Sequence, residues 1–156
     1  MGNDLTTDIL VIGAGIGGAT TALIAADHGC HVTVLTRSNP LVDGSTWRAQ
    51  GGIVYRGRKD SQTSLCHDIE TAGDGICWTD AVRTLAKEGV GIVDELLIDR
   101  LDVPFDRTPR GALDLTREGG HSVARILHCA DFTGKSIEEG LWRALGTHPK
   151  ITIMSG

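Results

Sequence analysis

The sequence predicts an α/β fold in which a βαβ unit begins the chain and a parallel sheet continues it. Short apolar, β-branched runs at 9–12 and 32–35 have the composition of buried strands, and a glycine-rich turn and a helical stretch separate them. A further run of this kind lies at 151–154. Because a βαβ core is normally flanked by more strands, we expect an incomplete sheet, the N-terminal part of a larger domain.

The turn after the first strand carries the GxGxxG spacing of nucleotide-binding turns, in the residues Gly13, Ala14, Gly15, Ile16, Gly17 and Gly18. Gly13 allows a tight turn, Gly15 lets a pyrophosphate approach the backbone, and Gly18 allows the helix and strand to pack closely. Free amide groups at the start of the helix favour bound phosphates. Since the motif lies between two strand-like runs, it predicts a Rossmann-like dinucleotide site, with a purely structural glycine turn as the alternative.

The end of the second strand bears on which dinucleotide would bind. An acidic residue usually hydrogen-bonds a ribose hydroxyl there, but this position holds Thr36, followed by Arg37. Thr36 offers a hydroxyl without a carboxylate, and Arg37 either favours the extra phosphate of NADP or is a solvated strand end. On this motif alone, NAD, NADP and FAD all stay open.

Length and composition are those of one globular domain, with 156 residues, 40% of them hydrophobic and 22% charged. The net charge of −5 and the lack of a basic cluster argue against nucleic-acid binding. The sequence shows neither a membrane-spanning run nor a signal peptide, so we expect a cytoplasmic protein. The 4 cysteines form no CxxC pair and the 6 histidines show no ligand spacing, so we expect no metal site.

After the second strand, residues 38–52 are expected to form a loop, because they are rich in Ser, Asn, Pro, Asp and Gly. The pair at 60–61 would cap a helix over 65–73, and the pair at 79–80 would begin another over 81–100. Apolar residues of that second helix recur near the helical period at Ala81, Leu85, Val90, Val93 and Leu97.

The second half of the chain is predicted to contain two short strands, a helix and the terminal strand. The strands cover 112–116 and 123–127 and flank a turn with two glycines. Thr133 and Gly134 begin the last helix. Its apolar face consists of Ile137, Leu141 and Leu145.

Two of the predicted loops carry side chains suited to ligand binding. The first offers hydroxyls, an amide and two glycines to a flat ligand, in Ser45, Thr46, Trp47, Arg48, Ala49, Gln50, Gly51 and Gly52. The second gathers Arg117, Glu118, His121 and Ser122 around a flexible diglycine. A surface turn and a solvated hairpin are the alternative interpretations. His128 is expected to be a core histidine with satisfied hydrogen bonds.

Taken together, these motifs resemble one family. The segments GSTWRAQGGI, AGDGIC, VPFDR, LTREGGHS, RILHCADFTG and HPKI, after the GxGxxG turn, are similar to L-aspartate oxidases of the succinate dehydrogenase and fumarate reductase flavoprotein superfamily. The resemblance extends from Asp8 to Met154. AQGG is shared across the superfamily, whereas LTREGGHS and RILHxADxTG are specific to aspartate oxidases. The resemblance implies non-covalently bound FAD in place of NADP.

The resemblance also implies roles for individual residues. Ala14, Gly15, Ile16 and Gly17 would line the pyrophosphate. Arg37 would lie beside the adenosine half of FAD, and residues 45–52 would follow the ribityl chain and the isoalloxazine. Glu118 matches the acid that orients the aspartate by pairing with its amino group, and His121 and Ser122 would bind substrate beside it.

The implied reaction is the oxidation of L-aspartate to iminoaspartate, the first step of NAD biosynthesis through quinolinate. A hydride passes to the flavin, which dioxygen or fumarate reoxidises. Quinolinate synthase is the implied protein partner, and oligomer formation stays open. By resemblance, the groups that clamp the substrate carboxylates belong to a capping domain and later segments, so residues 1–156 are expected to be an inactive N-terminal fragment.

Two alternatives stay open beside this interpretation. Another succinate- or fumarate-handling flavoprotein would carry a histidine for covalent flavin attachment where Ser45 stands. The other alternative is a non-catalytic FAD-binding fragment.

Overall fold

The computed structural model describes residues 6–37 and 44–155. The chain divides into two compact units. Unit 1 comprises Met1–Ala49 and Gly134–Gly156, and unit 2 comprises Gln50–Thr133. The predicted loop at 38–52 falls partly outside the described residues, at 38–43. Within the described part of the chain, no helix combines the length and the apolar character needed to cross a lipid bilayer.

Unit 1 is built on a parallel sheet of three strands in the order β1-β2-β6, which confirms the predicted βαβ unit and terminal strand. The strands are β1 (Ile9–Ile12), β2 (Val32–Thr36) and β6 (Ile151–Ser155). Their register aligns Val11 with Val34, and Val34 with Ile153. The central strand is the most buried, and Val32 and Val34 are almost fully covered, because it has a neighbouring strand on each side.

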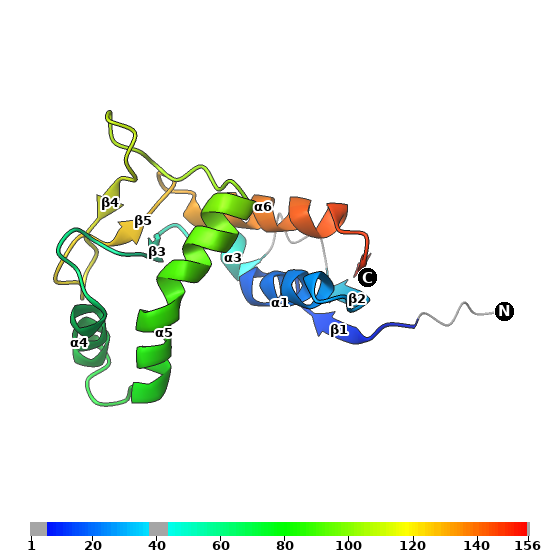
Figure 1. The fold of residues 1–156 in the computed structure, drawn as a ribbon, viewed down its shortest axis with the longest axis horizontal. Coiled ribbons are helices and arrows are strands. Elements are labelled where there is room, and N and C mark those ends of the chain that lie inside the picture. The colour runs from blue at the N-terminus through cyan, green and yellow to red at the C-terminus, as the bar shows by residue number, and fades with distance from the viewer. Residues whose placement is uncertain (1–5, 38–43, 156) are drawn as a thin grey trace. The chain divides into compact units, whose positions relative to one another are not determined.

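Helix α1 (Ile16–Asp27) connects β1 to β2 and packs against the sheet (Figure 1). Its packing face consists of short side chains and one leucine, in Ala19, Ala22, Leu23 and Ala26. Short side chains let the helix approach the strands closely. Gly29 has a φ of +98° just after the helix, so this glycine provides the left-handed backbone of a helix end.

Helix α6 (Thr133–Thr147) begins where the sequence predicts. It buries the expected face of Ile137, Leu141 and Leu145. The prediction of a loop fails at Ser45–Arg48, which form the one-turn helix α3. A single turn is too short to show a hydrophobic period, so its sequence is indistinguishable from that of a polar loop.

Unit 2 contains helix α4 (Gln62–Ala72), helix α5 (Thr79–Ile92) and the π-helix η1 (Val93–Arg100), which continues α5 (Figure 1). The predicted cap of α4 is confirmed, because the Oγ of Ser61 accepts the backbone N–H of Ser64 at 3.0 Å. The second predicted helix is confirmed too, although its last part adopts wider π-helical turns.

The buried face of α5 differs from the predicted one by one residue. Val82 and Ala86 are buried, whereas Ala81 is exposed and Leu85 is 49% exposed. The buried pair and the predicted pair both have i, i+4 spacing, so the helical period alone does not show which pair is buried. The packing of α4 against α5 decides which of the two faces is covered. Val93 begins η1 and is buried as expected, because it lies seven residues after Ala86 and so continues the same helical face.

A small antiparallel sheet completes unit 2, with the strand order β3-β5-β4. Its strands are β3 (Ile53–Val54), β4 (Leu115–Thr116) and β5 (Ile126–Leu127). The strands predicted at 112–116 and 123–127 therefore exist, but only their last two residues form continuous ladders, and Leu113 adds an isolated bridge to Arg107. β3 was not predicted, because a two-residue strand has no alternation to recognise.

Candidate functional site

The glycine turn in unit 1 has the geometry that its sequence predicts. Gly13 has a φ of +101°, which lets the chain turn sharply after β1. A Cβ at Gly18 would collide with the carbonyl oxygen of Gly13, so the close approach of helix and turn requires glycine there. A Cβ at Gly17 would meet nothing within 4 Å, so this position opens onto free space.

Helix α3 lies against the start of α1. The backbone N–H of Ile16, at the first residue of α1, donates to the Oγ1 of Thr46 at 3.0 Å. A Cβ at Gly15 would lie 3.2 Å from the same oxygen. Gly134 also faces α3, since a Cβ there would collide with the carbonyl oxygen of Thr46. The glycine turn and the predicted second cofactor segment are therefore in direct contact within unit 1.

A buried carboxyl group lies next to this contact. Glu138 of α6 is only 1% exposed. Burial raises the pKa of Glu138 to about 7, and a hydrogen bond with the side chain of Thr46 acts in the opposite direction. A buried carboxyl group beside a glycine turn fits a ligand that carries hydroxyl groups, as the ribityl and ribose parts of FAD do.

The other cofactor residues predicted in unit 1 differ in how far their side chains are buried. Thr36 is buried at the end of β2, and Arg37 follows it with an exposed side chain. Lys135 of α6 places its ammonium 5.2 Å from the ring centroid of Trp47, within the range of a cation–π contact. Ser45 is exposed at the first turn of α3.

The predicted cofactor residues Gln50, Gly51 and Gly52 belong to unit 2. Gly52 has a packing requirement, because a Cβ there would collide with the carbonyl oxygen of Leu127 in β5. A Cβ at Gly51 would lie 3.6 and 3.7 Å from the two carboxylate oxygens of Glu118. The structure thus brings together two segments that the sequence singled out separately.

Gly51 and Glu118 line a cavity of about 490 Å³ in unit 2. The cavity is also lined by Gln50, Asp106, Thr116, His128, Ala130 and Asp131. Glu118 follows β4 and has an exposed side chain, so a ligand that enters from solvent can reach its carboxylate. A volume of this size holds a small polar ligand.

His128 is one of the residues of this cavity that sequence reasoning did not select. Its Nδ1 lies 2.9 Å from the Oδ2 of Asp106, but its Nε2 is buried without a partner among the described residues. The prediction that His128 has satisfied hydrogen bonds is therefore wrong for Nε2, although Nδ1 has a partner. Since His128 follows β5 directly and Asp106 lies far away in sequence, no local spacing could have linked them.

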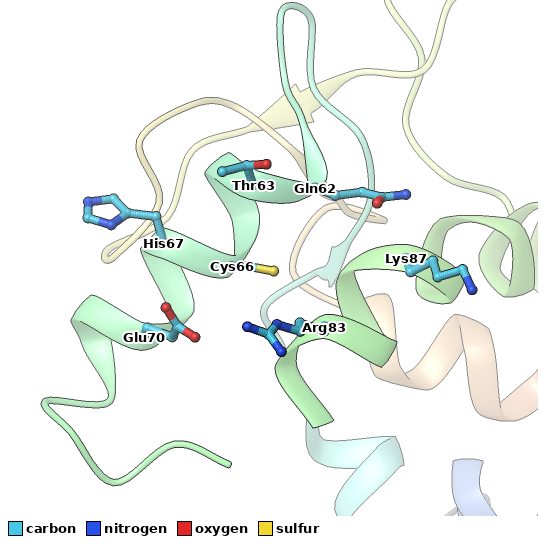
Figure 2. Close-up of a pocket in the computed structure, with 7 residues that line it drawn as sticks. All are labelled: Gln62, Thr63, Cys66, His67, Glu70, Arg83 and Lys87. Atoms are coloured by element: carbon cyan, nitrogen blue, oxygen red, sulfur yellow. The ribbon is translucent and has the colours of Figure 1, made fainter. Parts of the chain in front are cut away.

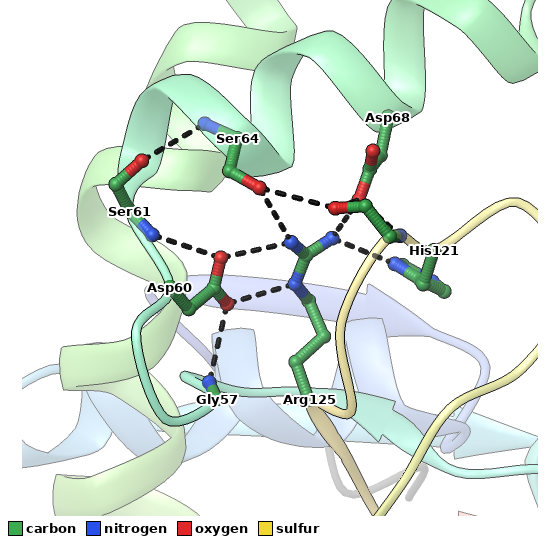
Figure 3. A network of polar contacts seen from close by, with 8 residues as sticks. Gly57, Asp60, Ser61, Ser64, Asp68, His121 and Arg125 are labelled. Atoms are coloured by element: carbon green, nitrogen blue, oxygen red, sulfur yellow. Dashed lines mark hydrogen bonds and ion pairs between the residues drawn. The ribbon is translucent and has the colours of Figure 1, made fainter.

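His121 and Ser122, the other predicted substrate residues, do not line this cavity. The Nδ1 of His121 lies 3.0 Å from the Nη1 of Arg125 (Figure 3). Ser122 donates through its backbone N–H and its hydroxyl to Asp68. A role for these two residues in substrate binding stays a prediction. Their contacts in the structure hold the loop that contains Glu118.

Arg125 is the centre of that polar network (Figure 3). Its side chain is fully buried, and its Nε and Nη2 each lie 2.8 Å from one carboxylate oxygen of Asp60, while Nη1 donates to Asp68. Burial alone would raise the pKa of Asp60, but hydrogen bonds from Arg125 and Gly57 lower it. Two carboxylates thus neutralise one buried guanidinium and hold it rigidly.

A second cavity, of about 560 Å³, lies between α4 and α5. Figure 2 shows Arg83 and Lys87 of α5 on one side, and Cys66, His67 and Glu70 of α4 on the other. None of the residues that line this second cavity belongs to a segment that the sequence singled out. We place the candidate substrate site at the cavity around Glu118, because Glu118 and Gly51 come from two such segments and meet there.

Comparison with known proteins connects these features to flavoproteins. The profile of the FAD binding domain family matches residues 8–155. The L-aspartate oxidase of Halobacterium salinarum is 41% identical over 149 residues, which cover 96% of this chain and 28% of that protein. The L-aspartate oxidase of Yersinia pestis is 41% identical over 151 residues, which cover 94% of this chain and 28% of that protein.

Solved structures give the same result for the fold. The Mycobacterium smegmatis Sdh1 complex in the apo form matches with a TM-score of 0.88 at 27% identity, over 96% of this chain and 27% of that chain. A quinol fumarate reductase FrdA from E. coli matches with a TM-score of 0.86 at 25% identity, over 96% of this chain and 26% of that chain. The chain therefore spans about a quarter of the length of these relatives.

Proposed function

Because the chain belongs to the FAD binding domain family, we propose that it is the FAD-binding segment of an L-aspartate oxidase, in which FAD oxidises L-aspartate to iminoaspartate. The observation that carries this proposal is the cavity in which Glu118, within the LTREGGHS segment, lies against Gly51 of the AQGG segment. The 41% identity to two L-aspartate oxidases supports it.

In this proposal the turn at 13–18 and helix α3 hold the pyrophosphate and ribityl parts of FAD. Backbone N–H groups in the first turn of α1 after Ile16, whose own N–H is bound to Thr46, supply donors for the phosphates, and the position without a neighbour at Gly17 leaves them room. Glu138 and Thr46 supply oxygen acceptors beside this turn. FAD, when bound, accepts the hydride that leaves the substrate α-carbon.

The residues around Glu118 would orient the substrate. Its carboxylate is a counter-ion for the α-ammonium group, and the amide of Gln50 lies in the same cavity as a further polar contact. In the family that the sequence resembles, the groups that bind both substrate carboxylates belong to other segments than these 156 residues. We therefore expect the segment by itself to oxidise aspartate very slowly.

The main competing function is that of a succinate- or fumarate-handling flavoprotein, since one of the solved relatives is a quinol fumarate reductase by title. Their 25–27% identity is lower than the 41% of the aspartate oxidases. Ser45, at the position where covalently flavinylated relatives carry histidine, also favours the aspartate oxidase.

The decisive experiment is anaerobic flavin reduction by the FAD-loaded full-length protein. L-Aspartate should bleach the flavin absorption and yield iminoaspartate, whereas succinate should bind and leave the flavin oxidised. Subsequent additions of dioxygen and of fumarate would show which of them restores the oxidised spectrum. Bleaching by succinate with no response to aspartate would replace the proposed function by the competing one.

A further inference from the structure

We propose that Glu138 is a positioning residue of the cofactor site, which acts through Thr46 and makes the affinity for FAD fall as the pH rises through neutrality. The inference rests on the proposed function, in which FAD binds at the start of α1. Three observations carry it: the burial of Glu138, its hydrogen bond with the hydroxyl of Thr46, and the hydrogen bond that this hydroxyl oxygen accepts from α1. All of these groups belong to unit 1.

Thr46 supplies the cap that helix α1 lacks. The residue before the helix, Gly15, has no side chain to accept a hydrogen bond. The backbone N–H of Ile16 donates instead to the Oγ1 of Thr46 at 3.0 Å. Because this oxygen accepts through a lone pair, its own O–H stays available as a donor to the carboxyl group of Glu138. Two hydrogen bonds thus link the first residue of α1 to Glu138.

Helix α6 holds Glu138 against α3. The backbone N–H of Gly134 donates to the carbonyl oxygen of Ala49 at 2.9 Å, and a Cβ at Gly134 would collide with the carbonyl oxygens of Thr46 and Ala49. Glu138 follows Gly134 by four residues and therefore lies on the same face of α6. Since the side chain is 1% exposed, it acts on a ligand at α1 through Thr46.

The buried carboxyl group has no counter-ion that sets its charge. The charged residues of α3 and of the first two turns of α6 are Arg48, Lys135 and Glu139, and the first turn of α1 has none. None of them acts on the pKa of Glu138, which burial raises to about 7 against the hydrogen bond from Thr46. The group therefore changes from neutral to negatively charged close to neutral pH.

The ionised carboxylate and the pyrophosphate of FAD would compete for the positive end of α1. The N–H groups of Gly17 and Gly18 have no acceptor within the helix and would bind the phosphates. A second negative charge, two hydrogen bonds away from the N–H of Ile16, opposes this binding, and the protein interior screens it little.

Linkage gives the sign of the pH dependence. Bound pyrophosphate disfavours the carboxylate form of Glu138, so the pKa of Glu138 is higher with FAD than without it. The affinity for FAD is therefore complete below the pKa of the free protein, about 7, and is lost as the pH rises above it. In that upper range, binding of FAD is accompanied by uptake of a proton.

The test measures the Kd of FAD for the full-length apoprotein from the change in flavin fluorescence, between about pH 6 and pH 8.5, on both sides of the pKa of Glu138. The wild-type Kd should rise about five- to tenfold over this range. Glu138→Gln should give a flat profile at the affinity that the wild type has at low pH. Glu139→Gln is the matched control, because it removes an exposed carboxylate from the same helix, and it should keep the wild-type slope.

Two further measurements separate this role from a merely structural one. Calorimetry near pH 8 in buffers of different ionisation enthalpy should detect proton uptake when FAD binds to the wild type, and none with Glu138→Gln. Thr46→Val removes the hydroxyl that favours the ionised carboxylate, so the midpoint of the pH profile should move to higher pH.

The same slope in wild type and Glu138→Gln would overturn the inference, as would an unchanged midpoint in Thr46→Val. If Glu138→Gln does not fold, the wild type alone decides, because a flat profile without proton uptake excludes the proposed role. Failure of the wild-type protein to bind FAD at any pH would instead overturn the proposed function.

Discussion

Ser122 presents both its backbone N–H and its hydroxyl to one oxygen of Asp68, the Oδ2, at 2.8 and 2.9 Å. These bonds attach the diglycine loop to helix α4. The pKa of Asp68 falls to about 2, because the Ser122 backbone N–H and the Arg125 guanidinium favour its ionised form against the effect of burial. The stabilisation is therefore complete above the ordinary pKa of an aspartate and is lost as the pH falls towards 2.

Replacing Arg125 by methionine should strongly destabilise unit 2. The change leaves the carboxylates of Asp60 and Asp68 without their buried cation, and removal of one partner from a buried ion pair costs about 3–5 kcal/mol. Urea denaturation followed by circular dichroism measures the change in the free energy of unfolding.

Arg83→Met is the control for the loss of an arginine charge. Arg83 and Asp80 lie 3.6 Å apart with side chains 70% and 77% exposed, so the cost should stay below about 1 kcal/mol. Similar losses in both variants would show that the Arg125 network contributes no more than a surface pair.

The glycine turn allows a second matched pair of variants. Gly18→Ala should destabilise the protein by about 1–3 kcal/mol or more, because its Cβ would collide with the backbone of Gly13. Gly17→Ala meets no neighbouring atom and lies in a helix, so it should stabilise by about 0.5–1 kcal/mol. Thermal unfolding of both variants without FAD measures this, and a similar Tm change in both would contradict the packing argument.

Sequence reasoning succeeded where a feature is local. The turn at Gly13, the strand at 32–35 and the face of α6 all follow from residues within a few positions of one another. The contacts that build the site are not local: Arg125 reaches Asp60 and Asp68 across 65 and 57 residues. Such pairings leave no periodic signal, so the structure was needed to find them.

The same limit explains the site residues that were missed. Glu118 was found because its segment resembles a known motif, whereas His128 looks like an ordinary histidine beside a strand. Its contact with Asp106, which lies 22 residues earlier in the chain, becomes visible only in the structure.

Glu138→Gln should change the pH dependence of stability. The pKa of Glu138 is raised from 4.5 to about 7, so the folded state holds a proton that the unfolded state releases between these values. Wild-type stability should therefore fall as the pH rises from 4.5 to 7, by about 1–3 kcal/mol. The uncharged variant should lack this fall and have the higher Tm at pH 8. Parallel Tm curves for the two proteins from pH 4 to 8 would show that Glu138 is not buried as a neutral acid.

Any flavin bound to the protein should be released by acid. Ser45 stands where a covalently flavinylated relative would carry histidine, and its hydroxyl is a poor nucleophile for the flavin. Precipitation with acid should leave all the yellow colour in the supernatant as FAD. Flavin fluorescence on the washed, denatured polypeptide would contradict this expectation.

Glu118→Gln tests the recognition of the substrate in the full-length protein. The substitution keeps the size and the hydrogen-bonding ability of the side chain near Gly51 but removes the charge that would pair with the ammonium group. A hydrogen bond to a charged group contributes about 1.5–3 kcal/mol, so kcat/KM for L-aspartate should fall roughly ten- to a hundredfold. Succinate and fumarate have no ammonium group, so their affinity should be unchanged or improved.

The alternative is that Glu118 merely occupies a solvated loop next to Arg117. A surface ion pair contributes less than about 1 kcal/mol, and its loss would affect all ligands alike. Aspartate kinetics and succinate inhibition measured on the same variant separate the two cases. Equal effects on both ligands, or unchanged kinetics with aspartate, would remove Glu118 from the site, whereas a selective loss for aspartate would identify its carboxylate as the group that distinguishes an amino acid from a plain dicarboxylate.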